Sequence, residues 1–158
     1  MPVNLFPLTW LLPSGNLFIQ AERQAEIFDY KNMIEYDIAN IPDSVRVYPA
    51  SAGTALFPMT PANNWTATII FCGGTNLNAD QWLTNWNISA YAADTSCVTI
   101  TPDVDLTWYH DDALAAGRSM GNVRFVLLAW CLYSVHQPTR WTTILCQRSR
   151  NRYSWIRQ

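Results

Sequence analysis

The sequence predicts an all-β protein built from units of four short antiparallel strands. Aromatic residues make up 13% of the 158 residues and charged residues 14%, a balance that suits buried strands better than solvated helices. Short runs that are apolar, or that alternate between apolar and polar residues, recur before residue 112, and Gly, Pro, Asn and Asp separate them. Four such runs fit into about forty residues, which is the size of one propeller blade.

The first expected unit opens with a tight hairpin. An apolar run ends at Pro13, and the following Ser14-Gly15-Asn16 supplies the positive φ angle that a hairpin turn requires. The next run returns as the partner strand, and two further runs alternate between polar and apolar residues, as half-buried strands do. The four expected strands are Leu8–Leu12, Leu17–Ala21, Glu26–Tyr30 and Ile34–Ile38.

A second unit of the same kind is expected further along the chain. The loop Thr60–Trp65 separates its first two strands, and the second of them runs into Cys72-Gly73-Gly74. The connection Thr75–Thr95 is rich in Asn, Asp, Ala and Trp, so we expect an excursion there with at most a short helix. The four expected strands are Gly53–Pro58, Thr66–Phe71, Cys97–Thr101 and Leu106–Tyr109.

The composition changes abruptly at Asn122. All twelve acidic residues lie at or before Asp112 and all six glycines at or before Gly121, whereas six of the ten basic residues follow Asn122. We therefore divide the chain into a folded part, residues 4–122, and an irregular basic tail, residues 123–158. The arginines of this tail are not interleaved with Gly or Lys, which argues against a nucleic-acid partner. They are Arg124, Arg140, Arg148, Arg150, Arg152 and Arg157.

Simple patterns disfavour other classes of protein. The longest apolar run, Phe125–Tyr133, is too short to cross a bilayer, so we expect no membrane partner. No basic segment followed by a long apolar run is visible near Met1, so no signal peptide is recognised and the location stays open. None of the four cysteines has metal-ligand spacing, which argues against a zinc site. Two glycosylation sequons begin at Asn64 and Asn87, and they matter only in a secreted protein.

Five motifs, in this order along the chain, resemble those of one enzyme family. The family is that of the fungal glyoxal oxidases, which belong with galactose oxidase among the copper radical oxidases. The resemblance runs from about Asn4 to Asn122 and covers an interior slice, about two four-stranded kelch-like blades of the family's seven-bladed β-propeller. The motifs are Leu11–Phe18, Arg46–Ala55, Thr60–Asn64, Phe71–Gly74 and Gly117–Asn122.

The resemblance implies the chemistry of a secreted oxidase. Members of the family oxidise a small aldehyde or primary alcohol with O2 and yield hydrogen peroxide. Their site holds one copper ion, a tyrosine cross-linked to a cysteine, a second tyrosine and two histidines. Copper suits imidazole and phenolate ligands, and the radical stores the electron that one copper ion cannot supply.

The resemblance carries few site residues onto this chain. Tyr109-His110 looks like the family's adjacent Tyr-His ligand pair, but that pair belongs to a later blade, so we interpret His110 as an exposed loop histidine. No catalytic residue or metal ligand is assigned, and no cofactor is expected in this slice. We therefore expect a fragment that is catalytically inactive on its own. The alternative is a small kelch-like module that binds glycans or proteins, which would need the tail to pack onto the blades.

Arg46 is the one candidate for contact with substrate. It comes just before the first strand of the second unit, where family members tend to line the face that holds copper. By analogy with galactose oxidase, Arg46 then binds the hydroxyl group of the substrate. The alternative is that Arg46 donates hydrogen bonds to loop carbonyls between blades.

Two further sets of residues have two interpretations each. Cys72 ends one expected strand and Cys97 begins the next, so they form either a disulfide, in an oxidising compartment, or two buried free thiols. Four tryptophans are interpreted as packing residues rather than as a carbohydrate platform. They are Trp10, Trp65, Trp82 and Trp86.

The genetic code offers an explanation for the tail. Codons compatible with Val135–Thr143, read one nucleotide later, permit Phe-Ile-Asn-Leu-Pro-Asp-Gly-Arg-Leu, which resembles the next blade of the family. Val123-Arg124 is compatible with a splice donor, and Ser134 with the first base of Val135 is compatible with an acceptor. Our hypothesis is that Val123–Ser134 is translated intron and that the remaining residues are an exon read out of frame.

Overall fold

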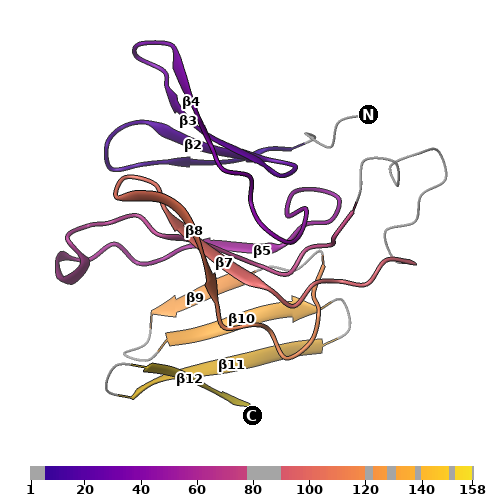
Figure 1. Cartoon of the computed structure of the whole chain (residues 1–158). Helices are drawn as coiled ribbons and strands as arrows, with labels where there is room; N and C mark the ends of the chain where they lie inside the picture. The colour runs from indigo at the N-terminus through magenta and orange to yellow at the C-terminus, as the bar shows by residue number, and fades with distance from the viewer. Residues whose placement is uncertain are drawn as a thin grey trace.

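Three antiparallel sheets of four strands follow one another along the chain (Figure 1). The computed structural model describes residues 6–77 and 90–119, and, beyond them, the backbone of four strands between residues 123 and 157. Each sheet is formed by four consecutive strands in their order along the chain. The predicted all-β class, with two four-stranded units before Asn122, is confirmed.

The first sheet has the four expected strands, but its third strand begins at Gln24 rather than Glu26, and its fourth is exposed over most of its length rather than half-buried. The tight turn forms at Gly15, whose φ is +89°, and the N–H of Gly15 donates to the carbonyl of Leu12 at 2.8 Å. The alternation along the second strand places Phe18 and Gln20 inside and their neighbours half outside. The strands are β1 (Leu8–Leu11), β2 (Leu17–Ala21), β3 (Gln24–Asp29) and β4 (Ile34–Ile38).

The second sheet also has the expected strands, with shifted ends. Its second strand begins at Ile69 rather than Thr66, because the loop before it includes a short 3-10 helix, η1 (Pro61–Asn63). Its last strand extends on both sides of the expected Leu106–Tyr109. The strands are β5 (Gly53–Leu56), β6 (Ile69–Cys72), β7 (Cys97–Thr101) and β8 (Asp105–Asp111).

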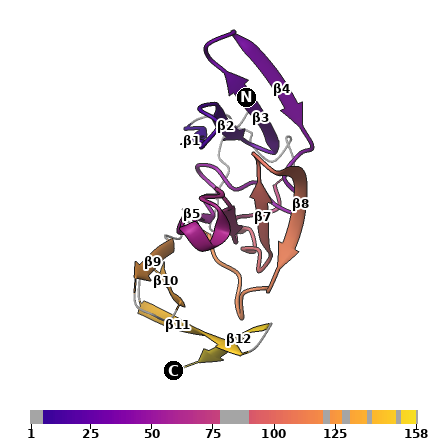
Figure 2. The same ribbon diagram turned by 90° about the vertical axis from the view of Figure 1, so that its left-hand side faces the viewer.

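The core lies between these two sheets, which are stacked in both views (Figures 1 and 2). Phe18 from β2 and Phe71 from β6 are fully buried there. The ring of Trp10 lies 5.4 Å from that of Phe71, and the ring of Trp108 lies 5.7 Å from Phe71 and 6.3 Å from Phe18. Burying each such aromatic side chain contributes about 1.5–3 kcal/mol. Trp10 is therefore a packing residue, as predicted, whereas Trp65 is 57% exposed.

The third sheet differs from the expectation of an irregular tail. It runs antiparallel throughout, in the order β12-β11-β10-β9. Val, Ile, Phe, Tyr, Thr and Trp recur through this stretch, and these residues favour extended backbone whatever the origin of the sequence. The strands are β9 (Val123–Leu127), β10 (Cys131–Gln137), β11 (Arg140–Ser149) and β12 (Arg152–Arg157).

The excursion expected between the second and third strands of the second sheet, Thr75–Thr95, falls mostly outside the described residues, and Trp82 and Trp86 fall there with it. At its described ends, Thr75 forms bridges with Val45 and Ala93. Within the described part of the chain, no helix is long and apolar enough to cross a membrane.

Candidate functional site

Arg46 occupies the loop between the two sheets and is completely buried, with an exposure of 0%. The backbone around it is fixed because Val45 and Thr75 exchange hydrogen bonds of 3.0 and 3.1 Å. Val45 and Val47, on either side, are buried in an apolar cluster with Leu77. The apolar neighbours thus anchor the loop and direct the arginine into the protein.

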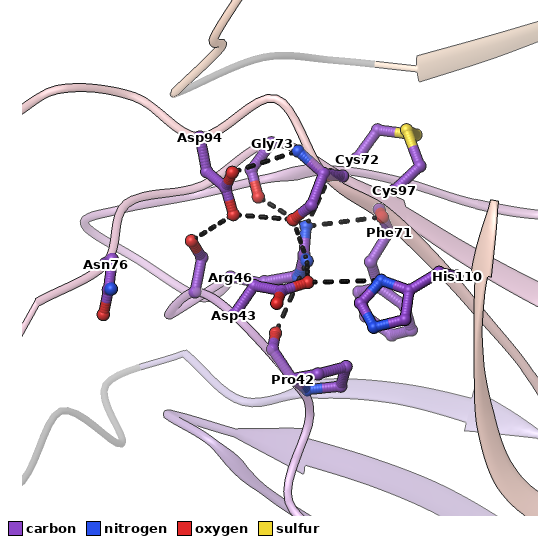
Figure 3. A network of polar contacts seen from close by, with 12 residues as sticks. Pro42, Asp43, Arg46, Phe71, Cys72, Gly73, Asn76, Asp94, Cys97 and His110 are labelled. Carbon is purple, nitrogen blue, oxygen red and sulfur yellow. Dashed lines mark hydrogen bonds and ion pairs between the residues drawn. A yellow bond between two sulfur atoms is a disulfide. The ribbon is translucent and has the colours of Figure 1, made fainter. Parts of the chain in front are cut away.

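The guanidinium of Arg46 donates mainly to backbone carbonyls (Figure 3). Its Nη1 donates to Gly73 O at 2.6 Å and to Ser96 O at 3.1 Å. Its Nη2 donates to Ser96 Oγ at 2.8 Å. Longer contacts reach Phe71 O at 3.4 Å and Pro42 O at 3.5 Å. One side chain therefore joins three separate segments of backbone, which the planar fork of arginine permits and lysine does not.

Two carboxylates partly balance the buried charge. The nearest oxygen of Asp43 lies 3.7 Å from Arg46 Nη2, and Asp94 contributes a favourable charge interaction. Burial lowers the pKa of Arg46 to about 10, against the raising effects of Asp94 and Asp43. Arg46 therefore stays protonated at neutral pH.

Asp94 is held in place by two serines. Ser44 Oγ donates to Asp94 at 2.5 Å and Ser96 Oγ at 2.6 Å, and the backbone N–H of Ser96 donates at 3.0 Å. Burial by itself raises the pKa of Asp94, but the hydrogen bonds from Ser44 and Ser96 and the charge of Arg46 together lower it. We call Arg46, Ser44, Gly73, Asp94 and Ser96 the arginine network.

A disulfide lies directly beside this network. The structure joins Cys72 at the end of β6 to Cys97 at the start of β7, and the two residues are direct partners in the strand register. Gly73 follows one cysteine and Ser96 precedes the other, and the N–H of Gly73 donates to Ser96 O at 2.9 Å. The covalent bond and the arginine network thus act on the same end of the second sheet.

Glycines allow the backbone to pass closely at this end. Gly73 has a φ of +83°, and a Cβ there would lie 2.2 Å from the carbonyl oxygen of Arg118. Gly74 has a φ of +101°, and its Cβ would lie 2.5 Å from the carbonyl oxygen of Val45. The motif Phe71-Cys72-Gly73-Gly74 therefore needs glycine for both conformation and space.

The segment Gly117–Ser119, which we call the strap, bonds to the loops at the end of the second sheet where Gly74 and Asp94 lie. The N–H of Arg118 donates to Asp94 O at 3.0 Å, and Arg118 O accepts from the N–H of Gly74 at 2.7 Å. Ser119 Oγ donates to Ala50 O at 2.8 Å. A Cβ on Gly117 would lie 1.9 Å from Ala93 O, so the strap fits only with glycine there.

His110 lies in a strand, and not in the exposed loop that the sequence predicted. It belongs to β8 and is exposed, and its Nδ1 lies 3.5 Å from a carboxylate oxygen of Asp43. The neighbouring Tyr109 is also exposed and donates its hydroxyl hydrogen to Asp105. Alternation along the strand places the two side chains on opposite faces, so they do not form a ligand pair.

The side chains present do not fit a copper radical site. Among the described residues no group of three or more His, Cys, Asp and Glu could hold a metal ion. Cys72 is engaged in the disulfide and is not available for cross-linking to a tyrosine. His110 is the only histidine whose side chain belongs to the described part of the chain, and it contacts Asp43.

Arg46 was predicted from a sequence motif, but its partners were not. The contacts of Arg46 are those of the alternative interpretation, hydrogen bonds to loop carbonyls, and a substrate-binding role stays a prediction. Asp94 and Ser44 lie 50 residues apart in sequence and carry no joint pattern. The Asp94-Thr95-Ser96 sequence is a weak signal, because an aspartate two residues before a backbone N–H often caps a turn.

The structure describes one of the two predicted glycosylation sequons. Asn64 is exposed at the end of η1, with φ 53° and ψ 36°. Asn87 lies outside the described residues.

Comparisons with known proteins give one consistent result. The chain matches the family model described as "Glyoxal oxidase N-terminus" over residues 2–129. Art an 7 of Artemisia annua, named as a candidate aldehyde oxidase, is 31% identical over 130 residues, which are 76% of this chain and 22% of that protein. Aldehyde oxidase GLOX1 of Arabidopsis thaliana is 35% identical over 82 residues (48% and 13%). Aldehyde oxidase GLOX of Vitis pseudoreticulata is 38% identical over 79 residues (48% and 14%). The chain thus spans less than a quarter of the length of these plant relatives.

Proposed function

The chain belongs to the glyoxal oxidase N-terminal family, and from this premise we propose that it is part of a copper radical oxidase. The parent enzyme, related to galactose oxidase, oxidises a small aldehyde or primary alcohol with O2 and releases hydrogen peroxide. The family match over residues 2–129 carries the proposal, and the aldehyde oxidase names of the plant relatives support the class of substrate.

This chain contributes scaffold and not chemistry to that enzyme. Its first two sheets are two blades of the seven-bladed, kelch-type propeller, and the copper ion and the Tyr-Cys radical cofactor are held by other parts of the parent enzyme. The bond from Cys72 to Cys97, which leaves the Cys72 thiol unavailable for a Tyr-Cys cross-link, supports this division. On its own the chain is therefore inactive as an oxidase.

Arg46 supports the blade that faces the reaction site of the parent enzyme. Its buried guanidinium fixes the carbonyl oxygens of Gly73 and Ser96. These contacts favour an indirect effect on the reaction, through the position of the loops at that end of the blade, over direct contact with substrate.

The parent enzyme is extracellular, and the disulfide between Cys72 and Cys97 supports this location. Residues 123–158 arise from translated intron and an exon read out of frame. Sequencing transcripts across the codon of Asn122 tests this origin. A mature message that keeps the inserted piece in every copy would contradict it.

The functional proposal is tested by comparing this chain with the longer protein encoded at its locus. Both are incubated with Cu²⁺, freed of unbound metal and given methylglyoxal in a peroxidase-coupled assay for hydrogen peroxide. The longer protein should retain copper and produce peroxide, whereas this chain should do neither. Peroxide from this chain alone would contradict its role as scaffold, and a longer protein without oxidase activity would contradict the family function.

A further inference from the structure

Asn64 lies at the tip of the connection between β5 and β6, in a well-defined turn. Its φ of 53° and ψ of 36° are in the left-handed region, which Asn adopts more readily than most residues. Its backbone N–H donates to Pro61 O at 3.2 Å, and the N–H of Thr66 donates to Asn63 O at 3.1 Å. These bonds hold the backbone of the sequon Asn64-Trp65-Thr66 at the surface.

The two adjacent asparagines of this turn differ in what their side chains contact. Asn63 accepts a hydrogen bond from the N–H of Thr60 at 2.8 Å and donates to Pro58 O at 3.0 Å, so its amide is used within the turn. Asn64 is exposed, and within the described part of the chain no hydrogen bond engages its side-chain amide. The structure thus leaves the amide of the sequon residue open to solvent.

The disulfide gives an independent indication of the compartment. Cys72 and Cys97 are 5% and 3% exposed and are bonded to each other. Such bonds form and persist in oxidising compartments, among them the lumen of the endoplasmic reticulum. That lumen is also where asparagine residues of Asn-X-Ser/Thr sequons receive oligosaccharides.

The turn projects away from the rest of the protein. The connection between β5 and β6 extends to the left of the second sheet in Figure 1 and toward the viewer in Figure 2. Leu56 pairs with Ile69 next to this turn, whereas Gly53 pairs with Cys72 at the other end of the ladder. A bulky group on Asn64 would therefore lie at the end of the sheet opposite the arginine network.

We propose that Asn64 is an N-glycosylation site. The donor is a lipid-linked oligosaccharide pyrophosphate, supplied with its transferase by the host cell. A bond forms between Asn64 Nδ2 and the anomeric carbon of the first sugar, and the bond from that carbon to the pyrophosphate oxygen breaks. The lipid pyrophosphate leaves with the electron pair, and the amide loses one proton. No oxidation or reduction is involved.

The test uses the full chain behind a cleavable signal peptide in a eukaryotic cell. An Asn87→Gln background leaves Asn64 as the only sequon. The secreted protein is treated with peptide N-glycosidase in ¹⁸O-water, and peptide mass spectrometry locates any aspartate that has gained the label. The expected result is one labelled aspartate, at position 64, and loss of one glycan from the intact mass.

Matched variants separate the sequon from the turn. Asn64→Gln and Thr66→Ala should each abolish the glycan, and Thr66→Ser, which keeps the hydroxyl group, should retain it. If little protein is secreted, the pool inside the endoplasmic reticulum is analysed in the same way, because transfer of the oligosaccharide precedes export. Unmodified Asn64 in both pools of the Asn87→Gln protein would overturn the proposal.

Discussion

Arg46 donates a 2.6 Å hydrogen bond to the carbonyl oxygen of Gly73, the residue directly after the disulfide-bonded Cys72. The same nitrogen donates to the carbonyl oxygen of Ser96, directly before Cys97. One charged side chain therefore holds the two backbone segments that the disulfide also joins. Hydrogen bonds from a charged donor are stronger than neutral ones, so the polar and covalent links reinforce each other at this end of the sheet.

The first prediction concerns the geometry of the Arg46 side chain. Lysine keeps the charge, but its single nitrogen cannot replace both Nη1, which donates to Gly73 O and Ser96 O, and Nη2, which donates to Ser96 Oγ. We therefore expect Arg46→Lys to lower the free energy of unfolding by about 2–3 kcal/mol. Urea unfolding followed by tryptophan fluorescence measures this, because Trp10 and Trp108 pack in the core. Arg23→Lys is the control: the side chain of Arg23 donates to exposed Asn76, and this substitution should cost less than about 1 kcal/mol. Equal stability of Arg46→Lys and wild type would contradict the prediction.

The second prediction concerns the disulfide. Cys72 and Cys97 are 25 residues apart in sequence, and closing a loop of that size contributes about 3 kcal/mol in the chain-entropy description. We expect a Cys72→Ser, Cys97→Ser protein to lose about that much stability and to respond no further to dithiothreitol. Cys131→Ser, Cys146→Ser is the matched control and should keep its sensitivity to the reductant. If reductant has no effect on the stability of the control, Cys72 and Cys97 are not bonded in solution.

A third prediction follows from the ionisation of Asp94. Its folded-state pKa is lowered, so the ionised form is stabilised by folding. This contribution is fully present above the unfolded pKa of about 3.9 and is lost as pH falls through the folded value. Asp94→Asn should therefore be less stable than wild type at pH 7, and the difference should shrink below pH 4. Thermal unfolding at a series of pH values measures it, and a difference that stays constant from neutral pH down to about pH 2 would contradict the prediction.

A fourth prediction separates lack of space from backbone conformation at two glycines. Gly73 and Gly15 have similar φ angles, +83° and +89°, but a Cβ at Gly73 would lie 2.2 Å from Arg118 O, whereas at Gly15 the nearest atom is Lys31 Nζ at 3.7 Å. We expect Gly15→Ala to cost about 1 kcal/mol from conformation alone. Gly73→Ala should cost at least about 2 kcal/mol more, because backbone must move. If urea unfolding gives the same loss of stability for both variants, the strap moves to accommodate a methyl group at little cost, which would contradict the prediction.

Local pattern was enough to predict most of the two blades. The alternation in Ile34–Ile38 and the turn residues around Gly15 act over a few residues, so strand identity and hairpin geometry follow from the sequence. The start of β6 was predicted three residues too early. Thr66 and Ala67 have β-prone neighbours, but they belong to the loop between η1 and β6. The strands after Asn122 were missed because composition indicated a different origin there, and composition does not determine backbone pairing.

The arginine network could not be predicted from sequence patterns. The acceptors of Arg46 are mostly main-chain carbonyls, and every residue has one, so they leave no mark on the sequence. Asp94 meets Ser44 because Thr75 bridges both Val45 and Ala93, the neighbours of these two residues. Arg46 itself was found through a family motif, and its burial became visible only in the structure.

The strap gives the second blade a definite last residue. Ser119 makes the final contact of the described blade, to Ala50, and the change in composition begins three positions later, after Asn122. A cut, fusion or splice junction placed beyond Ser119 would therefore keep the strap's hydrogen bonds to Gly74, Asp94 and Ala50, whereas one placed before Gly117 would remove them. We therefore expect a chain that ends at Ser119 to keep the contacts that close the second sheet, whatever sequence follows.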